Sequence, residues 1–278
     1  MRRLLFFVLL TSCGGAAPEP VAPKPLPSAA ATETAPKPAP PETSGGCPAG
    51  MQRVAGGELY MGSPVGRGEK DERPEHKVEV ADFCFAEREV SAADYGACVK
   101  NGICDALPKD AKLESQEAPD EKLSVTCSAR SANDADLPAN CVDLAAAKKY
   151  CAWKGHRLPT EKEWEWAATG GLDSLAYPWG AAPPSDSVAC WQHTRGPCHV
   201  GAKIEEAFGL RDLGGNVSEW TDTRYGPYPE PPKEGTLYVI RGASFATTNV
   251  DDMRAKRRSS AHAGDRLPTL GFRCAASL

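Results

Sequence analysis

Four short runs with strand-like patterning predict the β-strands of this chain. Residues 54–61 (VAGGELYM) and 77–85 (KVEVADFCF) show the alternation of apolar and polar positions that half-buried strands have. Residues 238–244 and 270–275 are predicted core strands near the C-terminus. Residues 105–140 are polar and interrupted by prolines, which predicts a loop-rich excursion between the strands.

Three helices are predicted from the residues that start them. A serine, threonine or aspartate at the N-cap accepts a hydrogen bond from the first turn, and a glutamate three residues later completes a capping box. Few short helices and strands, separated by long loops, predict an irregular α+β fold. The predicted helices run from Ser91 to Lys100 before Asn101-Gly102, from Asp143 over residues 144–153, and from Thr160 with Glu163 over the segment that carries Trp164 and Trp166.

The first residues have the form of an export signal. Arg2 and Arg3 precede a short apolar run, residues 4–10, which is too short to span a bilayer of about 20 helical residues. Leu-Thr-Ser-Cys13 resembles a bacterial lipobox, which predicts a signal peptide over residues 1–12 and a lipid on Cys13. The alternative is an ordinary cleaved signal with an incidental cysteine. Gly14 favours the outer membrane over inner-membrane retention, so a cell-envelope location is predicted.

Composition divides the remaining chain into two parts. Residues 13–46 are rich in proline and alanine and almost free of large apolar side chains, so they are predicted to be a disordered tether. Residues 47–278 are long enough for one domain with a substantial core.

The charge of the chain excludes one class of partner. Without Arg2 and Arg3, 30 basic residues stand against 37 acidic ones, a net charge of −7. An acidic exported protein is not expected to bind nucleic acid, nor to bind anionic lipid through its charge.

The cysteines agree with an oxidising compartment. Besides Cys13 there are ten, an even number without any Cys-x-x-Cys pair, which predicts disulfides rather than a zinc site. Cys190–Cys198 would close a short loop and Cys47–Cys84 would join the first strands. The remaining pairings around the excursion stay open among Cys98, Cys104, Cys127 and Cys141.

The stretch of residues 209–220 (GLRDLGGNVSEW), called the signature loop below, is the strongest candidate for a site. Two adjacent glycines allow a tight wrap of the backbone, and Asp212 and Glu219 bracket them. Hard carboxylate and carbonyl oxygens in a tight loop suit calcium. The alternative is a buried turn whose acids cap amides and pair with arginines. The residues alone leave both interpretations open.

Five blocks of the chain resemble the formylglycine-generating enzyme (sulfatase-modifying factor) family. The resemblance covers about residues 47–278 and implies an irregular C-type-lectin-like α+β fold. It also implies a Cys151–Cys274 disulfide and a calcium site made by Asp212, Gly215, Val217 and Glu219. The blocks are residues 56–63 (GGELYMGS), 157–167 (RLPTEKEWEWA), 212–220 (DLGGNVSEW), 241–245 (RGASF) and 271–274 (GFRC).

The family's chemistry requires residues that this chain lacks. Its enzymes oxidise the cysteine of a Cys-x-Pro-x-Arg motif with copper and oxygen, using two cysteines five residues apart after the block that here ends at Phe245. The corresponding positions fall near Thr247 and Asp252, whose hard oxygen ligands do not replace a bis-thiolate copper site. Copper is therefore not expected.

Three other candidates are weaker. Cys190 and Cys198 form the nearest alternative cysteine pair, but a loop disulfide explains them more simply. His193 and His199 share that loop without a known ligand spacing. A cleft formed by Ser244 with Arg257 and Arg258 could recognise a carboxylate or sulfate. The alternative, which we favour, is internal pairing of the basic cluster Arg254, Lys256, Arg257 and Arg258 with Glu161, Glu163 and Glu165.

These observations predict a lipid-anchored envelope protein with a non-catalytic domain. Its partner would be an unknown peptide, a glycan or an envelope protein. One alternative is a divergent oxidase or protein-maturation enzyme of the same family. A second alternative is a structural subunit of a surface assembly.

Overall fold

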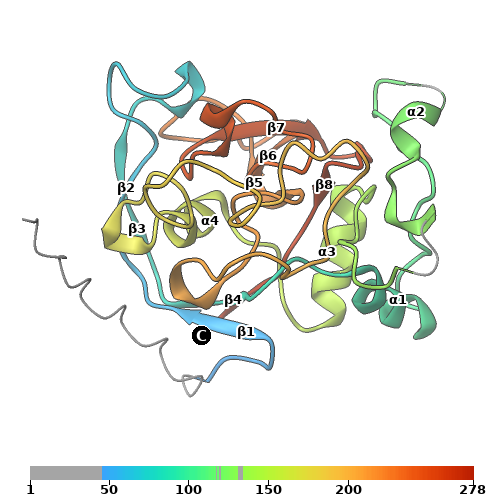
Figure 1. Cartoon of the computed structure of the whole chain (residues 1–278). Coiled ribbons are helices and arrows are strands. Elements are labelled where there is room, and N and C mark those ends of the chain that lie inside the picture. Colours follow the sequence, from blue (N-terminus) through green and yellow to red (C-terminus); the bar gives the residue numbers. More distant parts are fainter. Residues whose placement is uncertain (1–45, 117, 119, 131–133) are drawn as a thin grey trace, which may run out of the picture. The chain divides into compact units, whose positions relative to one another are not determined.

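The computed structural model describes residues 46–116, 118, 120–130 and 134–278. The predicted signal peptide, Cys13 and all but the last residue of the tether lie outside the described residues. The described part is an α+β domain of short elements joined by long loops (Figure 1). It contains no helix with the length and apolar character needed to cross a membrane.

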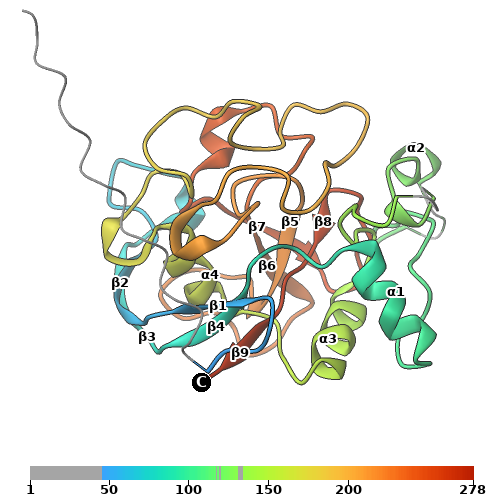
Figure 2. The same cartoon turned by 60° about the horizontal axis from the view of Figure 1, so that its bottom comes forward.

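The N-terminal strands belong to two small sheets. Strands β1 (Met51–Val54), β4 (Phe83–Ala86) and β9 (Ala275–Ser277) form one antiparallel sheet in the order β1-β4-β9, grouped together in Figure 2. Strands β2 (Gly57–Met61) and β3 (His76–Val80) form a separate antiparallel pair. The chain thus pairs its first strands with its last one.

Both predicted N-terminal strands are therefore wrong in extent, because each is two strands in different sheets. The first run breaks at Gly56, where the backbone lies so close to Val80 that a Cβ atom would be 2.1 Å from that residue's carbonyl oxygen. Only glycine fits such a close approach. Alternation continues across the break, so the pattern gave no sign of the change of sheet.

The third and largest sheet carries the signature loop at one end. Its order is β7 (Arg258–His262), β6 (Leu237–Arg241), β5 (Ser218–Arg224) and β8 (Leu270–Gly271), with β8 parallel to β5. The strand predicted over residues 238–244 exists as β6, but it ends at Arg241. The predicted run over residues 270–275 instead divides between β8 and β9, which belong to different sheets.

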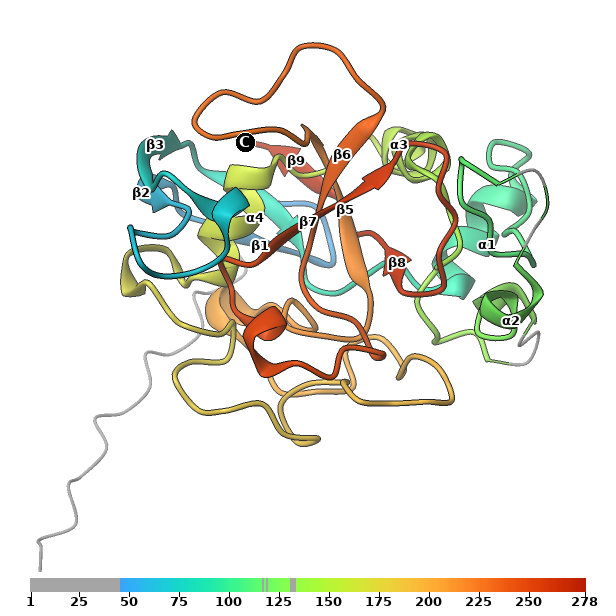
Figure 3. The same cartoon turned by 90° about the horizontal axis from the view of Figure 1, so that it is seen from above.

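The three predicted helices are confirmed with their caps. They are α1 (Ala92–Lys100), α3 (Leu144–Trp153) and α4 (Glu161–Ala168), and α1 and α4 begin with complete capping boxes. The polar excursion is loop-rich as predicted; its described residues include the short helix α2 (Glu121–Ser124) and a 3-10 turn at Ser128–Arg130. Seen from above, α1, α2 and α3 lie on one side of the larger sheet, with α4, β2 and β3 on the other (Figure 3).

Two apolar clusters form most of the core. One packs Tyr95 of α1 and Tyr150 of α3 against Phe272, with ring centroids 5.5 to 6.4 Å apart. The other surrounds Trp164 and Trp166 of α4. Large aromatic side chains thus supply much of the buried apolar area in both clusters.

Five disulfides staple the domain, and the described cysteines are all paired. Cys190–Cys198 and Cys47–Cys84, predicted from the sequence, are confirmed, as is the pairing that the family resemblance implied between Cys151 and Cys274. The four cysteines of the excursion pair among themselves, as expected. The bonds are Cys47–Cys84, Cys98–Cys104, Cys127–Cys141, Cys151–Cys274 and Cys190–Cys198.

Candidate functional site

Asn216 fixes the signature loop to its neighbours. Its backbone N–H donates to the carbonyl of Cys190 at 2.9 Å, and its own carbonyl accepts from the amide of Phe245 at 2.7 Å. Its side-chain oxygen accepts from the amide of Cys198 at 2.9 Å, and its side-chain nitrogen donates to Glu89 at 2.5 Å. Asn216 is fully buried at a φ of +64°, a conformation that asparagine tolerates better than most residues.

Glu219 of the loop is held by a buried ion pair. Its carboxylate accepts from the guanidinium of Arg273, whose side chain is 0% exposed, at 2.6 to 2.9 Å. The indole N–H of Trp164 donates to the same carboxylate at 2.9 Å. Arg273 also donates to the carbonyls of Ala86, Glu87 and Arg211, so this one side chain ties three segments together.

Three more carboxylates are buried around this pair. Glu206 accepts from the amides of Leu213 and Gly214, Glu89 accepts from the amide of Val217, and Asp212 accepts from the amide of Gly201. All of these hydrogen bonds stabilise the ionised form of the acid.

These three acids and Glu219 are called the acid cluster, and burial has the largest effect on the pKa values of Glu89, Glu206 and Asp212. Loss of hydration raises the pKa of Glu206 to about 8, although Arg273 acts in the opposite direction. Burial likewise raises the pKa of Glu89 well above its ordinary value, and that of Asp212, with the neighbouring carboxylates adding to the effect. Four buried carboxyl groups thus lie around one buried guanidinium, and the raised pKa values of Glu89, Glu206 and Asp212 favour their neutral forms as long as no further cation is bound.

The predicted calcium residues occupy one turn in this cluster. Asp212 supplies a carboxylate, and Gly215 and Val217 lie on the same turn, while Glu219 is engaged with Arg273. Glu89 and Glu206 lie beside this turn, and the sequence analysis did not predict that they belong to the site. Glu89 is 127 residues from Asn216, and no local pattern distinguishes either glutamate from a surface one.

The basic cluster is paired internally, as we favoured, but mostly with other acids than those predicted. Arg258 is 1% exposed and bonds Glu161 at 2.8 Å, so it belongs to the core and not to a cleft. Of the three acids predicted, Glu161 is the one that meets the cluster. The remaining pairs are Arg254 with Glu72, Lys256 with Glu75, Arg257 with Asp252 and Asp71, Glu163 with Arg157, and Glu165 with Arg241.

Thr247 and Asp252, which the family resemblance places at the positions of the copper-binding cysteines, make polar contacts within the chain. The hydroxyl of Thr247 accepts from the amide of Ser244 at 3.0 Å, and Asp252 pairs with Arg257 at 3.0 Å. Ser244 is 6% exposed and lies 3.4 Å from the Thr247 hydroxyl. The three predicted cleft residues are thus either buried or held by neighbours.

Two pockets open near these elements. One, of about 580 Å³, borders the segment with Asp251, Arg254 and Lys256 and is completed by Ser63 and Arg67. Its lining carries charges of both signs, and it includes Asp251, the residue before Asp252.

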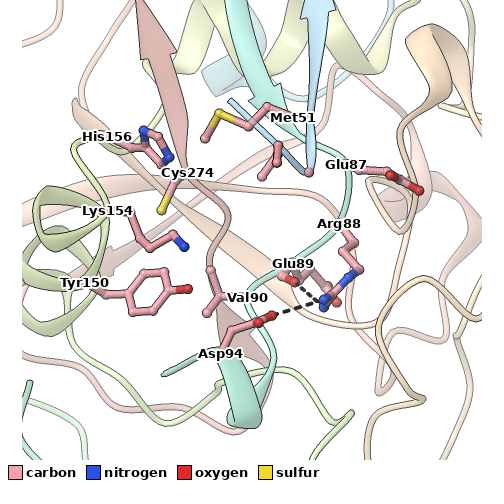
Figure 4. A pocket seen from close by; sticks show the side chains of 13 residues that line it. Met51, Glu87, Arg88, Glu89, Val90, Asp94, Tyr150, Lys154, His156 and Cys274 are labelled. Carbon is pink, nitrogen blue, oxygen red and sulfur yellow. Dashed lines mark hydrogen bonds and ion pairs between the residues drawn. The ribbon is translucent and has the colours of Figure 1, made fainter. Parts of the chain in front are cut away.

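The other pocket, of about 250 Å³, lies between α3 and the ends of β1 and β4 (Figure 4). Its wall contains Tyr150, Lys154 and His156, and Arg88 pairs across it with Asp94 at 3.1 Å. Burial raises the pKa of Tyr150 to about 12 and lowers that of His156, so both are neutral near pH 7. The charged side chains at its rim suit a small polar group.

A profile of the sulfatase-modifying factor enzyme 1-like domain matches residues 36–278. The chain belongs to this family. It is 30% identical to the formylglycine-generating enzyme of Streptomyces coelicolor over 89% of this chain and 94% of that enzyme.

Two further proteins are similar to this chain, one in sequence and one in its solved structure. The inactive C-alpha-formylglycine-generating enzyme 2 of Mus musculus is 37% identical over 51% of this chain, and the match spans only half of that protein's length. The solved structure of PvdO from Pseudomonas aeruginosa superposes with a TM-score of 0.64 and 25% identity, over 82% of this chain and 94% of PvdO. The irregular α+β fold is thereby established as that of the family.

Proposed function

We propose that this member of the sulfatase-modifying factor family is a non-catalytic binding or accessory protein. The observation that carries the proposal is the state of its cysteines: all ten in residues 47–278 are in disulfides, and the copper positions hold Thr247 and Asp252. A copper(I) site needs soft thiolate ligands, which a disulfide, a hydroxyl and a carboxylate do not supply. The match to an inactive relative supports the same conclusion.

The pockets support a polar ligand for such a module. The larger one has Arg67, Glu69 and Asp251 at its wall, beside Arg254 and Lys256, which are paired with Glu72 and Glu75. Both signs of charge at one opening suit a peptide backbone with charged side chains or termini better than a purely apolar ligand. An extended peptide is therefore the ligand we propose first, with a glycan as the alternative.

A peptide-oxidation assay tests the proposal. We expect the protein, supplied with copper(I), oxygen and a Cys-x-Pro-x-Arg peptide, to leave the peptide mass unchanged, while the Streptomyces coelicolor enzyme serves as the positive control. The double variant Thr247→Cys/Asp252→Cys should bind copper(I) where the parent does not, because it restores two soft ligands. Copper-dependent conversion of the peptide by the unmodified protein would establish the divergent oxidase instead, an alternative that the near full-length match to that enzyme keeps in view.

We also propose a structural calcium ion at the signature loop. The acid cluster has four buried carboxyl groups around the single buried guanidinium of Arg273, and a divalent cation bound there would favour their ionised forms and supply the charge that balances them. Asp212 with the carbonyls of Gly215 and Val217 would hold it, and Glu219 would take part as far as its pair with Arg273 allows. Calcium here would supply charge neutralisation and a fixed turn.

Replacing Asp212 distinguishes a role in calcium binding from a role in the geometry of the turn alone. The Asp212→Ala variant should lose about 2 kcal/mol more stability in calcium-saturated buffer than in chelator, because a bound ligand stabilises only the folded state that binds it. Alanine at the φ of +63° costs about 1 to 2 kcal/mol in both buffers, so the difference between them is the readout. The control is Asp222→Ala, an exposed residue of β5 paired with Lys148. Equal losses of melting temperature in both buffers would leave only a calcium-free turn.

Lipid anchoring to the outer membrane is proposed from the lipobox alone. Cys13→Ala should move the protein from the membrane fraction to the soluble fraction, because the lipid would have no attachment point. Fractionation of cells expressing both forms measures this. Continued membrane association of the variant, without a lipid on the protein, would point to a partner as the anchor.

A further inference from the structure

One of the five disulfides, Cys190–Cys198, differs from the rest in its surroundings. Of the five disulfides in the described residues, this one has polar groups within hydrogen-bonding distance of both sulfur atoms, and the other four do not. The imidazole Nδ1 of His193 lies 3.7 Å from Cys190 Sγ and 3.5 Å from Cys198 Sγ. The backbone N–H of Cys198, shared with Asn216 Oδ1, lies 3.2 Å from Cys190 Sγ.

The histidine is held in this position by its backbone. The His193 amide donates to the carbonyl of Phe245 at 2.7 Å, and the adjacent Gln192 amide donates to the carbonyl of Thr247 at 3.0 Å. The imidazole Nε2 lies 4.0 Å from the carboxylate of Asp186, on the side away from the sulfurs. The ring is partly exposed, so solvent can exchange its proton.

The two sulfurs are not equivalent. Cys190 is 1% exposed, whereas Cys198 is only half-buried and can be approached from solvent. A thiolate formed on Cys190 would receive the Cys198 N–H, and hydrogen bonds to a charged form stabilise it. The geometry thus distinguishes a sulfur to be attacked, Cys198, from a sulfur to leave, Cys190.

We propose that Cys190–Cys198 is a thiol–disulfide exchange site with His193 as its proton donor, and that its substrate is a dithiol. A thiolate of the dithiol bonds to Cys198 Sγ while the Cys190–Cys198 bond breaks. The electron pair leaves on Cys190 Sγ, which takes the proton from His193 Nδ1. The second thiol of the dithiol then displaces Cys198, which is protonated by solvent. The protein disulfide gains two electrons and two protons, and the dithiol becomes a disulfide.

The site lies where a change in redox state would reach the rest of the domain. The loop it closes is bonded to Asn216 of the signature loop and to the strip of residues 245–247, beside the lost copper positions. This activity is independent of the proposed peptide binding, because it uses neither pocket.

Selective reduction of the folded, unmodified protein tests the proposal. A water-soluble phosphine is the first reductant, because its attack on sulfur does not depend on a thiol that must first ionise. Free cysteines are alkylated and located by mass spectrometry over time. We expect Cys190 and Cys198 to be alkylated before the other eight cysteines. Opening of the five bonds at similar rates, or no opening without denaturant, would overturn the proposal.

Two histidine variants separate proton donation from loop exposure. His193→Gln should slow the reduction by about tenfold or more, because general acid assistance is removed. His199→Gln is the matched control: it lies on the same stretch, but its ring bonds Asp134 at 2.8 Å. Equal rates for the parent and His193→Gln would reject the role of the imidazole.

Trapping the first adduct tests the direction of attack. Brief treatment with a small monothiol, followed by acid quench and alkylation, should give the mixed disulfide on Cys198 and the alkyl group on Cys190. The reverse labelling, or an even division between the two sulfurs, would contradict the assignment of the leaving group.

Discussion

Replacing Arg273 by methionine is expected to lower the free energy of unfolding by about 3 to 5 kcal/mol, because the carboxylate of Glu219 then stays buried without its cation. Arg273 is fully buried and donates to Glu219 and to three backbone carbonyls. It is also the buried cation that opposes the raised pKa values of Glu206 and Asp212. Its removal therefore destabilises the whole acid cluster. Denaturant unfolding followed by tryptophan fluorescence measures the loss.

An exposed ion pair provides the control for this variant. Arg53 pairs with Asp82 at 2.7 Å, with side chains 51% and 43% exposed. Arg53→Met should cost about 1 kcal/mol or less, since solvent screens exposed pairs. A cost for Arg273→Met no larger than that of Arg53→Met would show that the acid cluster is protonated or solvated and does not depend on its guanidinium.

Removing the Cys151–Cys274 disulfide should lower the free energy of unfolding by about as much as Arg273→Met does. The cause is different. The bond joins α3 to the segment before β9 across 123 residues, and chain-entropy estimates for so long a loop reach about 5 kcal/mol. Both cysteines are buried, so the double variant Cys151→Ala/Cys274→Ala adds a small loss of packing. Chemical denaturation without reductant measures the change.

The short Cys98–Cys104 bond is the matched control. Its cysteines are only six residues apart, and the same estimate gives about 2.4 kcal/mol for Cys98→Ala/Cys104→Ala. We expect the long-range variant to lose roughly twice as much as the short-range one. Equal losses would mean that the unfolded chain is already compact, or that packing of the sulfurs matters more than closure of the loop.

Apart from the Cys47–Cys84 bond, which spans 37 residues, the disulfide and helix starts predicted correctly from the residues are local features. Ser91 and Thr160 start helices because their hydroxyl groups accept hydrogen bonds from amides three residues later, and this geometry depends on the next few residues alone. Closure of the Cys190–Cys198 loop follows from short separation in the same way. The prediction of the long-range Cys151–Cys274 bond rested instead on the resemblance to the family.

Features that depend on distant residues were missed. Strands β5 and β7 are rich in serine, threonine and charged residues, so their sequences lack the apolar alternation of a strand. Their burial comes from neighbours far along the chain. The acid cluster is similar, because Glu89 reaches the signature loop only after the sheets have formed. A glutamate beside Arg88 gives no indication in the sequence that it is 1% exposed.

The basic residues are a second case in which the partners, far apart in the chain, could not be predicted from the local sequence. Arg254, Lys256 and Arg257 are close together in one segment, which resembles a ligand-binding patch in the sequence. In the fold their partners Glu72, Glu75 and Asp71 come from a loop more than 180 residues earlier. A charge cluster read without its partners overstates the number of cations available to a ligand.

A count of free thiols on the native protein tests the central claim most directly. The protein is purified from the cell envelope without reductant and alkylated, then unfolded, reduced and alkylated with a second reagent. The non-catalytic account predicts that residues 47–278 take no label in the first step and ten labels in the second. Two cysteines labelled in the first step and protected by copper(I) would contradict it, and the oxidase would become the first hypothesis.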